Sequence, residues 1–544
     1  MFQFQQVAVS DDAQSGTEDV IVEVNSGRVQ GRRIYSQEIN KNFYAFQGIP
    51  YAQPPVGDLR FEAPLPAEKW DGVLAVQEDE RKCVQEFTGE GSEDCLYINV
   101  FTPEINSTAA LPVMVWIYGG AFREGSSKIQ KFSPDYFIGE NVIVVTFNYR
   151  LGVFGFLSTE DMASPGNYAL KDQILALEWV RDNIDYFGGN PNSVTVFGQS
   201  AGAASVSYLL QTPLAKNLFH RAIMQSGTSL NLWALTRNPR TTAFAIGRAF
   251  DIDTSNSSIL VQALKRIETR TLQAVSVSRE ITETVSKNPR DGLVFGPSTE
   301  PFFSGAVVRK KSHQKLNYGN FNAVPCMVGF TSQEGLPITS MSNFVKPYFF
   351  TYDLFSTRLV PIDMNAESFW KIPVALLIKQ RYFGFMPVGL SNDWVIQFVT
   401  DDQFVRPIHE YVSLVSKYIP VYFYRFSYEG KLGEENRNNR GVGHGEELSY
   451  LWKQENNVVN PPDSDLKTRQ RLIKLWTNFA KTSNPTPEHD ELLQDVTWPT
   501  STFKNIVYLD IGHNLTVSSD MSKYNIQFWK NLYNTNGVPP YDTY

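Results

Sequence analysis

The stretch SVTVFGQSAGAASVSYLL, residues 193–210, decides the fold class of this chain. Its first half carries the β-branched and aromatic residues of a buried strand, and the small and apolar residues after Gly202 suit a helix. Gly198-Gln199-Ser200-Ala201-Gly202 lies at the junction, so the Gly-x-Ser-x-Gly pattern has its required strand–turn–helix context. The turn leaves no room for side chains at its flanking positions, which accounts for the two glycines. We therefore predict that Ser200 is an exposed nucleophile rather than a chance match in a flexible loop.

Further apolar, β-branched runs lie on both sides of this stretch, separated by turn signals or helical segments. Between two of them, residues 171–184 repeat apolar positions every three to four residues, which predicts an amphipathic helix. A strand–helix–strand order implies a parallel sheet. A hairpin over residues 20–33, with its turn at Ser26-Gly27, is expected at one edge. The other predicted strands are residues 113–118, 142–147, 194–197, 222–225, 325–330 and 420–424.

The predicted fold class is α/β, with a large and mostly parallel central sheet, helices on both faces and long insertions around the mouth of the site. Two segments suit such insertions: residues 242–301 are rich in polar and helical residues, and residues 341–403 are aromatic-rich and irregular. No Pro/Gly/Ser-rich linker divides the chain, so we expect a single domain over residues 1–544.

The composition of the 544 residues excludes several classes of protein. With 42% hydrophobic and 19% charged residues, the chain can bury a large core, which argues against disorder. The formal net charge is -8 and no stretch is rich in Lys or Arg, so the sequence offers no basic surface for binding nucleic acid. No run approaches the roughly 18 to 20 apolar residues of a membrane span, so we expect neither nucleic acid nor a membrane as partner. The first residues, MFQFQQVAVSDDAQ, lack the basic and apolar segments of an export signal.

The three cysteines are too few for a disulfide framework. Cys83 and Cys95 stand twelve apart around a polar loop, and Cys326 lies in an apolar run, so one bridge and one buried thiol fit the pattern. Sequons of the form Asn-x-Ser/Thr, which a chain this long also contains by chance, begin at Asn106, Asn256 and Asn514. The bridge and the sequons together favour an oxidising compartment and therefore a secreted, extracellular protein.

Glycines after a second predicted strand provide a candidate site for negative charge. The run PVMVWIYGGAFREGSS, residues 112–127, ends its strand in Tyr118-Gly119-Gly120-Ala121-Phe122, where backbone N–H groups can approach a substrate oxygen closely. By itself this pattern is equally an ordinary Gly-Gly turn. Beside a serine at the positive end of a helix, it predicts an oxyanion hole.

A serine hydroxyl needs an imidazole to take its proton, and the chain has six histidines. His444 stands out because GVGHGEELSYLW places it between glycines after a long polar loop, well after Ser200. The order serine, acid, histidine then requires an acid between them. The apolar run AVPCMVGF breaks into TSQEG, which puts Glu334 just beyond a strand end. Many other Asp and Glu residues could be proposed, but none follows so clear a strand.

With these residues identified, the chain resembles the type-B carboxylesterase and cholinesterase family over nearly its whole length. This resemblance implies the α/β-hydrolase fold and a two-stage acyl transfer by Ser200, His444 and Glu334, with no cofactor and no metal. It rests on FQGIPYAQPPVGDLRFEAP (46–64), SEDCLYINVFTP (92–103), WIYGGAF (116–122), FNYRLGVFGFL (147–157), GNYALKDQILALEWVRDNIDYFGGNP (166–191), FGQSAG (197–202) and SGT (226–228), all in the family's order.

The same resemblance carries further roles onto single positions. The family's oxyanion hole corresponds to Gly120, Ala121 and Ala201, with Ala121 where the family more often has glycine. Two positions that support the triad in the family are Ser226 and Glu447 here. The family's first disulfide corresponds to Cys83 and Cys95.

Two features depart from the cholinesterases and bear on the substrate. The loop VQEFTGEGSED between Cys83 and Cys95 has no Trp for a quaternary ammonium, and Gln199 is neutral where cholinesterases have an acid. GQSAG together with GVGH is most similar to insect juvenile hormone esterases and odorant-degrading esterases. We therefore expect a monomer or weak homo-oligomer that acts on a small apolar ester. A xenobiotic-detoxifying, insecticide-sequestering esterase and a catalytically inactive adhesion homologue are the alternatives.

Overall fold

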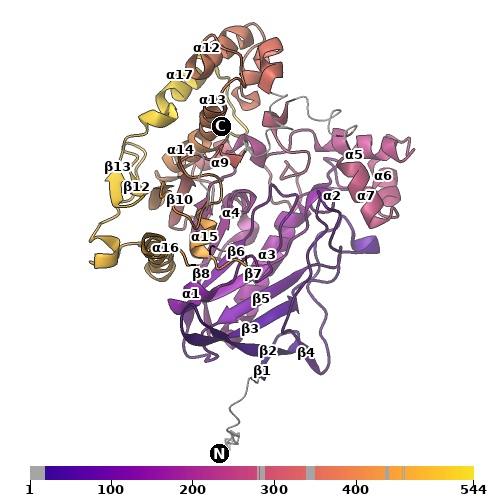
Figure 1. Ribbon diagram of the computed structural model, residues 1–544. Coiled ribbons are helices and arrows are strands. Elements are labelled where there is room, and N and C mark those ends of the chain that lie inside the picture. The colour runs from indigo at the N-terminus through magenta and orange to yellow at the C-terminus, as the bar shows by residue number, and fades with distance from the viewer. Residues whose placement is uncertain are drawn as a thin grey trace, which may run out of the picture.

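The computed structural model describes residues 19–278, 281, 288–337, 349–434, 440–455, 458 and 460–544. The N-terminal residues in which no export signal is expected lie outside this range, as do parts of the predicted 341–403 insertion and of the polar loop before His444. Within these described residues, thirteen strands form one sheet in the order β1-β2-β3-β5-β7-β6-β8-β9-β10-β11-β12-β13, with β4 paired to β2 (Figure 1). The expectation of a single domain over residues 1–544 stays a prediction.

The centre of the sheet is parallel, as predicted, because each of its strands reaches the next through a crossover. All six predicted strands are present with bounds shifted by a few residues. Their side chains are almost entirely buried, which is why each strand is a nearly continuous apolar run in the sequence. The parallel strands are β6 (Leu111–Ile117), β7 (Ile143–Phe147), β8 (Gly189–Gln199), β9 (Arg221–Gln225), β10 (Cys326–Thr331), β11 (Val421–Phe426) and β12 (Tyr508–Ile511).

Antiparallel strands extend both edges of the sheet. The predicted N-terminal hairpin exists, but its turn is Asn25-Ser26, one residue earlier than predicted. Gly27 is instead the first residue of its strand, where a Cβ would lie 2.5 Å from the Trp70 ring. The glycine therefore accommodates a tryptophan rather than the turn. These antiparallel strands are β1 (Asp19–Val24), β2 (Gly27–Ser36), β3 (Lys41–Pro50), β5 (Tyr97–Thr102) and β13 (Leu515–Ser518). The short strand β4 (Val73–Ala75) pairs with β2 in parallel.

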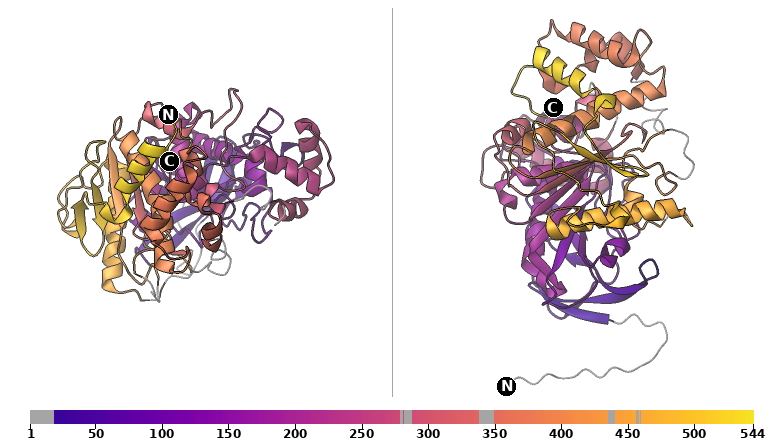
Figure 2. Two further views of the ribbon diagram at one scale, coloured as in Figure 1. Left: turned by 90° about the horizontal axis from the view of Figure 1, so that it is seen from above. Right: turned by 90° about the vertical axis from the view of Figure 1, so that its left-hand side faces the viewer.

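Helices cover both faces of the sheet (Figure 2). The helix predicted at residues 171–184 is α3, which begins three residues earlier, and the helix predicted after Ser200 is α4. The bounds of the long helices are α3 (Tyr168–Asn183), α4 (Ala201–Gln211), α14 (Arg406–Val415), α16 (Asp463–Thr482) and α17 (Ile526–Asn536). The short ones are α1 (Asp135–Gly139), α2 (Gly152–Phe156), α9 (Ser312–Asn317) and α15 (Leu448–Leu451).

The two predicted insertions are both largely helical where they are described. Residues 242–301 contribute α5 (Pro239–Ala249), α6 (Ser257–Leu264) and α7 (Thr269–Ser276), which lie at the right of Figure 1. The prediction that residues 341–403 are irregular is wrong for their described part. It forms α12 (Lys371–Phe383), α13 (Asn392–Val399) and the start of a π-helix, Thr400–Val405. Its exposed aromatic and aliphatic side chains, such as Phe369 and Ile372, hide the helical period in the sequence. No helix of the described residues has both the length and the apolar content to cross a membrane.

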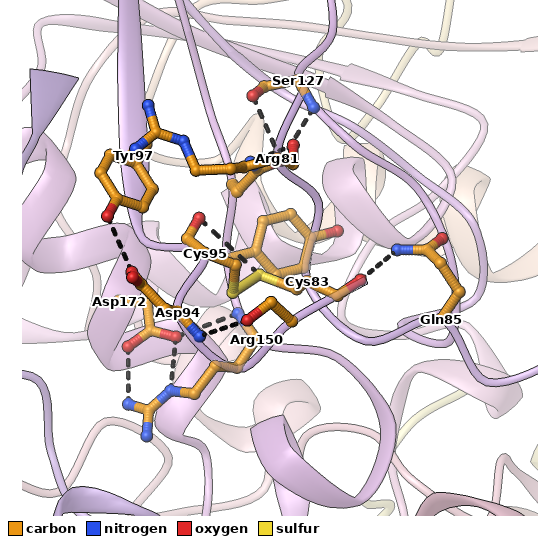
Figure 3. The surroundings of a disulfide bond; sticks show 12 residues. Arg81, Cys83, Gln85, Asp94, Cys95, Tyr97, Ser127, Arg150 and Asp172 are labelled. Carbon is orange, nitrogen blue, oxygen red and sulfur yellow. Dashed lines mark hydrogen bonds and ion pairs between the residues drawn. A yellow bond between two sulfur atoms is a disulfide. The ribbon is translucent and has the colours of Figure 1, made fainter. Parts of the chain in front are cut away.

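Cys83 and Cys95 form a disulfide, and Cys326 is a buried free thiol, so both cysteine predictions are confirmed. Figure 3 shows the bridge among polar contacts that fix its loop: Gln85 donates to the Cys83 carbonyl at 2.6 Å. Beside it, Tyr97 donates to Asp94 at 2.8 Å. The bridge therefore closes a short loop whose two ends are also held by hydrogen bonds.

Replacing Cys83 and Cys95 together by alanine is expected to lower the free energy of unfolding by about 2–4 kcal/mol, because the open loop gains conformational entropy in the unfolded chain. Urea unfolding followed by tryptophan fluorescence measures the change. Reduction of the wild-type protein should reproduce most of the loss, and reduction of the variant should add none. An unchanged unfolding midpoint in both cases would show that the bridge contributes nothing.

Candidate active site

The turn between β8 and α4 consists of Ser200 alone. Its φ of 58° and ψ of -122° form a conformation that L-residues rarely adopt, and such strain concentrates at functional sites. The N–H of Ser200 donates to the Gln225 carbonyl at 2.8 Å, which ties the turn to β9. A Cβ at Gly202 would lie 2.0 Å from the Ile117 carbonyl oxygen, so the close approach of β6 requires glycine there. The side chain of Ser200 is partly exposed at the strand ends.

His444 and Glu334 are joined by a hydrogen bond between two loops that are 110 residues apart in the chain. Nδ1 of His444 lies 2.6 Å from Oε2 of Glu334. The carboxylate is fully buried, whereas 22% of the imidazole is exposed. Oε1 of Glu334 accepts from the hydroxyl of Ser226 at 2.6 Å and from the N–H of Thr331 at 2.7 Å. These contacts fix the carboxylate, which in turn places the proton of a neutral imidazole on Nδ1 and leaves Nε2 as the acceptor.

Backbone contacts hold the two loops together. The N–H of Gln333 donates to the Val442 carbonyl at 2.8 Å, and the N–H of Val442 donates to the Ser332 hydroxyl at 3.0 Å. The N–H of Gly335 donates to the hydroxyl of Thr400, the first residue of the π-helix, at 3.0 Å. The orientation of His444 against Glu334 is therefore set by the fold rather than by two flexible side chains.

The two positions expected to support the triad act differently. Ser226, which has φ 57°, donates directly to Glu334. Glu447 is buried and accepts a hydrogen bond from Gln225 at 3.1 Å, while its Oε2 has no partner among the described residues. Burial, and next the charge of Glu334, raise the pKa of Glu447 to about 7. Glu447 thus influences the pair through its charge.

The residues expected in the oxyanion hole lie at the same end of the sheet. A Cβ at Gly119 would lie 3.0 Å from Cβ of Ser200, so the glycine segment after β6 passes directly beside the nucleophile. Gly120 and Ala121 have φ values of 110° and 54°. In the described part of the chain, the N–H groups of Gly120, Ala121 and Ala201 donate no hydrogen bond, and Ala201 begins α4. Free N–H groups at a helix N-terminus can stabilise a developing negative charge.

Gln199 has a contact with the histidine that the sequence does not predict. Its Nε2 lies 3.1 Å from Nε2 of His444, and its side chain is 5% exposed. No described residue hydrogen-bonds the hydroxyl of Ser200, the next residue. The amide therefore donates to the imidazole lone pair that would take the serine proton. We expect this contact to give way to Ser200 once a substrate carbonyl positions the hydroxyl, because such hydrogen bonds tighten in the substrate complex.

The electrostatics of the pair favour a histidine that is easily protonated. Burial alone would lower the pKa of His444, but the charge of Glu334, its hydrogen bond and the charge of Glu447 together outweigh burial and raise that pKa above its ordinary value. A raised pKa makes the imidazole a stronger base and stabilises the imidazolium that forms when it takes a proton.

This shift predicts how activity depends on pH. The base must be unprotonated, so kcat/KM should fall as pH drops through the pKa of His444, with a midpoint above about 6.5. Gln199→Glu should move the midpoint to higher pH, because a carboxylate beside Nε2 stabilises imidazolium. Glu447→Gln should move it to lower pH, because it removes a charge that raises the pKa. Profiles of kcat/KM measure both, and shifts of the same sign would contradict the assignment.

The chain is similar to known proteins over most of its length. The carboxylesterase family matches residues 18–529. The chain is 33% identical to the juvenile hormone esterase of Tribolium castaneum, over 89% of this chain and 86% of that protein. It is 31% identical to venom carboxylesterase-6 of Apis mellifera and 32% identical to liver carboxylesterase 1 of Mus musculus. The match covers 93% of both chains in the first case, and 94% of this chain and 93% of that protein in the second.

Among solved structures, the chain is similar to the juvenile hormone esterase of Manduca sexta, which has OTFP covalently attached. The two structures superpose with a TM-score of 0.85 at 28% sequence identity. The superposition covers 95% of this chain and 100% of that one. The structural similarity therefore extends over nearly the whole chain.

Proposed function

Because the chain belongs to the carboxylesterase family and is a serine carboxylesterase, we propose that Ser200, His444 and Glu334 hydrolyse uncharged carboxylic esters through an acyl-enzyme. The observation that supports these roles is the bond between His444 Nδ1 and a buried Glu334, beside a strained turn that exposes Ser200. The same bond argues against an inactive adhesion homologue, since such a protein has no need to bury a carboxylate that orients an imidazole.

In the proposed mechanism, Nε2 of His444 takes the proton of Ser200 as its oxygen attacks the ester carbonyl. The N–H groups of Gly120, Ala121 and Ala201 hold the oxyanion, each contributing about 3 kcal/mol of barrier lowering. His444 then gives its proton to the departing alcohol. A water molecule, activated in the same way, attacks the acyl-enzyme and releases the acid.

Contacts near the site favour an uncharged substrate over a cationic one. The only aromatic residue of the loop between the disulfide cysteines is Phe87, and the guanidinium of Arg123 lies 4.3 Å from its ring centroid. Arg123 also pairs with Glu86, and its carbonyl accepts from the N–H of Glu86 at 2.9 Å. The ring that could bind an ammonium group is thus occupied by a cation of the protein itself, which would repel a second one.

Aromatic side chains flank the catalytic pair and suit an apolar acyl or alkoxy group. Phe404 lies 4.9 Å from the His444 ring and 5.9 Å from Trp233, and both aromatic residues are half-buried. A Cβ at Gly227 would lie 2.4 Å from the Ser200 carbonyl oxygen and 3.0 Å from the Trp233 ring. Glycine at position 227 therefore lets Trp233 approach the turn that carries the nucleophile.

Within uncharged esters, the relatives named as juvenile hormone esterases favour that hormone or a similar apolar ester, such as a pheromone or odorant ester. The venom and liver carboxylesterases match the chain almost as well. A detoxifying esterase that sequesters insecticides is therefore the second candidate function. Turnover separates the two, since a sequestering esterase binds its ester tightly but regenerates slowly.

A panel of matched esters tests this proposal. Acetylcholine and its neutral isostere 3,3-dimethylbutyl acetate differ in charge alone, so kcat/KM should be higher for the isostere. A preference for acetylcholine would overturn the uncharged-ester proposal. A juvenile hormone, a medium-chain acetate and an aryl acetate form the second arm. If the hormone is hydrolysed no better than the aryl acetate, the hormone-esterase reading fails.

We also propose that the protein is secreted and glycosylated. The buried disulfide supports an oxidising compartment, and all three sequon asparagines, Asn106, Asn256 and Asn514, are exposed. Asn256 caps α6 through its Oδ1, which accepts from Ser258 and Ile259 and leaves the amide nitrogen free for a glycan. A loss of mass after digestion of the secreted protein with peptide N-glycosidase F tests this, and an unchanged mass would contradict it.

A further inference from the structure

A groove of about 620 Å³ lies between α16, α1 and the turn that joins β2 to β3. Helices α16 and α1 contact each other, and both lie in the left half of Figure 1. Neither Ser200, Glu334 nor His444 lines this groove. Its volume is within the range of small-molecule sites, and the proposed ester chemistry makes no use of it.

Arg469 of α16 lines the groove and is 8% exposed. Its guanidinium carbon lies 4.2 Å from the ring centroid of Tyr136. Its Nε is buried without a hydrogen-bond partner, and no carboxylate among the described residues pairs with it. A buried cation without a counter-ion is costly, and stacking on a ring offsets only part of that cost. The side chain is therefore poised to accept an anion.

The charges around Arg469 do not neutralise it. Each acidic side chain that lines the groove has another partner, and only Lys474 among its cations has a carboxylate nearby. Lys41 and Arg469 remain as positive charges without a carboxylate partner in the described part of the chain. The pairs are Glu38 with Lys453 at 3.4 Å, Glu140 with Lys481 at 3.5 Å and Lys474 with Asp490 at 3.8 Å.

Apart from the polar side chain of Gln470, the uncharged lining is mostly apolar. Ile39 comes from the β2–β3 turn, and Leu466 and Ile473 from α16, on either side of Arg469 in the chain. Carboxylates and phosphates match the planar fork of a guanidinium, which can donate two parallel hydrogen bonds to them. We propose that this groove binds an amphiphile whose oxyanion head, a carboxylate or a phosphate monoester, pairs with Arg469 and whose apolar chain lies along these side chains.

Isothermal titration calorimetry on the full-length protein tests the proposal with octanoate and octyl phosphate as probes. Both should bind saturably, and 1-octanol, which has the same chain without a charge, should bind at least 10-fold more weakly. The tighter of the two anions identifies the preferred head group. Protein whose Ser200 has been blocked covalently by an organophosphate should bind the probes as the untreated protein does, which separates this groove from the proposed ester site.

Two substitutions on the same helix provide the matched comparison. Arg469→Gln should weaken binding of the preferred anion at least 10-fold, and Lys467→Gln, which removes an exposed charge outside the groove, should leave it unchanged. Arg469→Lys should restore part of the affinity, because the charge remains but the fork is lost. Near-UV circular dichroism checks that each variant is folded.

Several results would overturn the proposal: no saturable binding of either anion, equal affinity for 1-octanol, or unchanged affinity in Arg469→Gln. Should Arg469→Gln fail to fold, Lys41→Gln takes its place, since Lys41 is an exposed residue of the same groove. Binding must then weaken severalfold, and unchanged affinity in that variant would equally refute the site.

Discussion

Ser200→Ala is expected to lower kcat for ester hydrolysis by about 10⁴- to 10⁶-fold, because no other hydroxyl stands at the turn between β8 and α4. His444→Ala should cost about as much, and the double variant hardly more, because a nucleophile and its base act as one unit. Pre-steady-state and long-time assays with an aryl acetate measure the loss. Residual hydrolysis above background would come from the oxyanion N–H groups and the binding surface alone.

Two controls separate the loss of the nucleophile from a loss of structure. Ser200→Ala removes one oxygen from a partly exposed side chain, so the unfolding midpoint should stay unchanged and serves as the control. Ser226→Ala removes a hydroxyl at the next strand end, where it only supports Glu334, and should cost far less activity. If Ser200→Ala retained wild-type turnover, or if Ser226→Ala cost as much as Ser200→Ala, the assignment of the nucleophile would be wrong.

Glu334→Gln is expected to lower kcat by about 10⁴-fold with little effect on KM, because an amide no longer selects the imidazole tautomer with its proton on Nδ1 and no longer stabilises imidazolium. The buried carboxylate accepts three hydrogen bonds, from His444, Ser226 and Thr331. An amide has a single oxygen, so at least one of these donors loses its partner.

The pH profile of Glu334→Gln separates a catalytic loss from a structural one. Removing the charge that raises the pKa of His444 should move the acid limb of any residual activity to lower pH. Glu334→Asp keeps the charge on a shorter side chain, so it should recover part of the lost activity and move the limb back. A variant that loses activity without any shift of the limb would indicate disturbed folding, and Glu334 would not be the orienting acid.

The sequence predicts the centre of this fold because parallel strands are buried on both faces and therefore appear as continuous apolar runs. The edge strands β3 and β5 are not predicted in this way, because their pairing is antiparallel and β3 has a register shift between Gln47 and Ile49. The sequence pattern places the hairpin turn one residue too late, because Gly27 makes room for Trp70, which is 43 residues away in the chain. Long-range packing of this kind leaves no local signal.

Some residues of the candidate site can be predicted from the sequence, and some of its contacts cannot. Ser200, His444 and Glu334 are predictable because each follows a local rule: a glycine-flanked turn, a loop between glycines, and an acid at a strand end. The contact between Gln199 and His444 joins residues 245 apart and depends on the path of two loops. The sequence does not predict the π-helix either, because its extra residue is fixed by tertiary packing. This π-helix binds Gly335 and places Phe404 against His444.

Peptide mass spectrometry after inactivation by an organophosphate gives the most direct test of the central claim, that the hydroxyl at this strained turn forms the covalent intermediate. The protein should lose activity in proportion to a single adduct, and the adduct should lie on Ser200. Inactivation with Ser200 unmodified, or with the adduct on another side chain, would contradict the mechanism proposed for this chain.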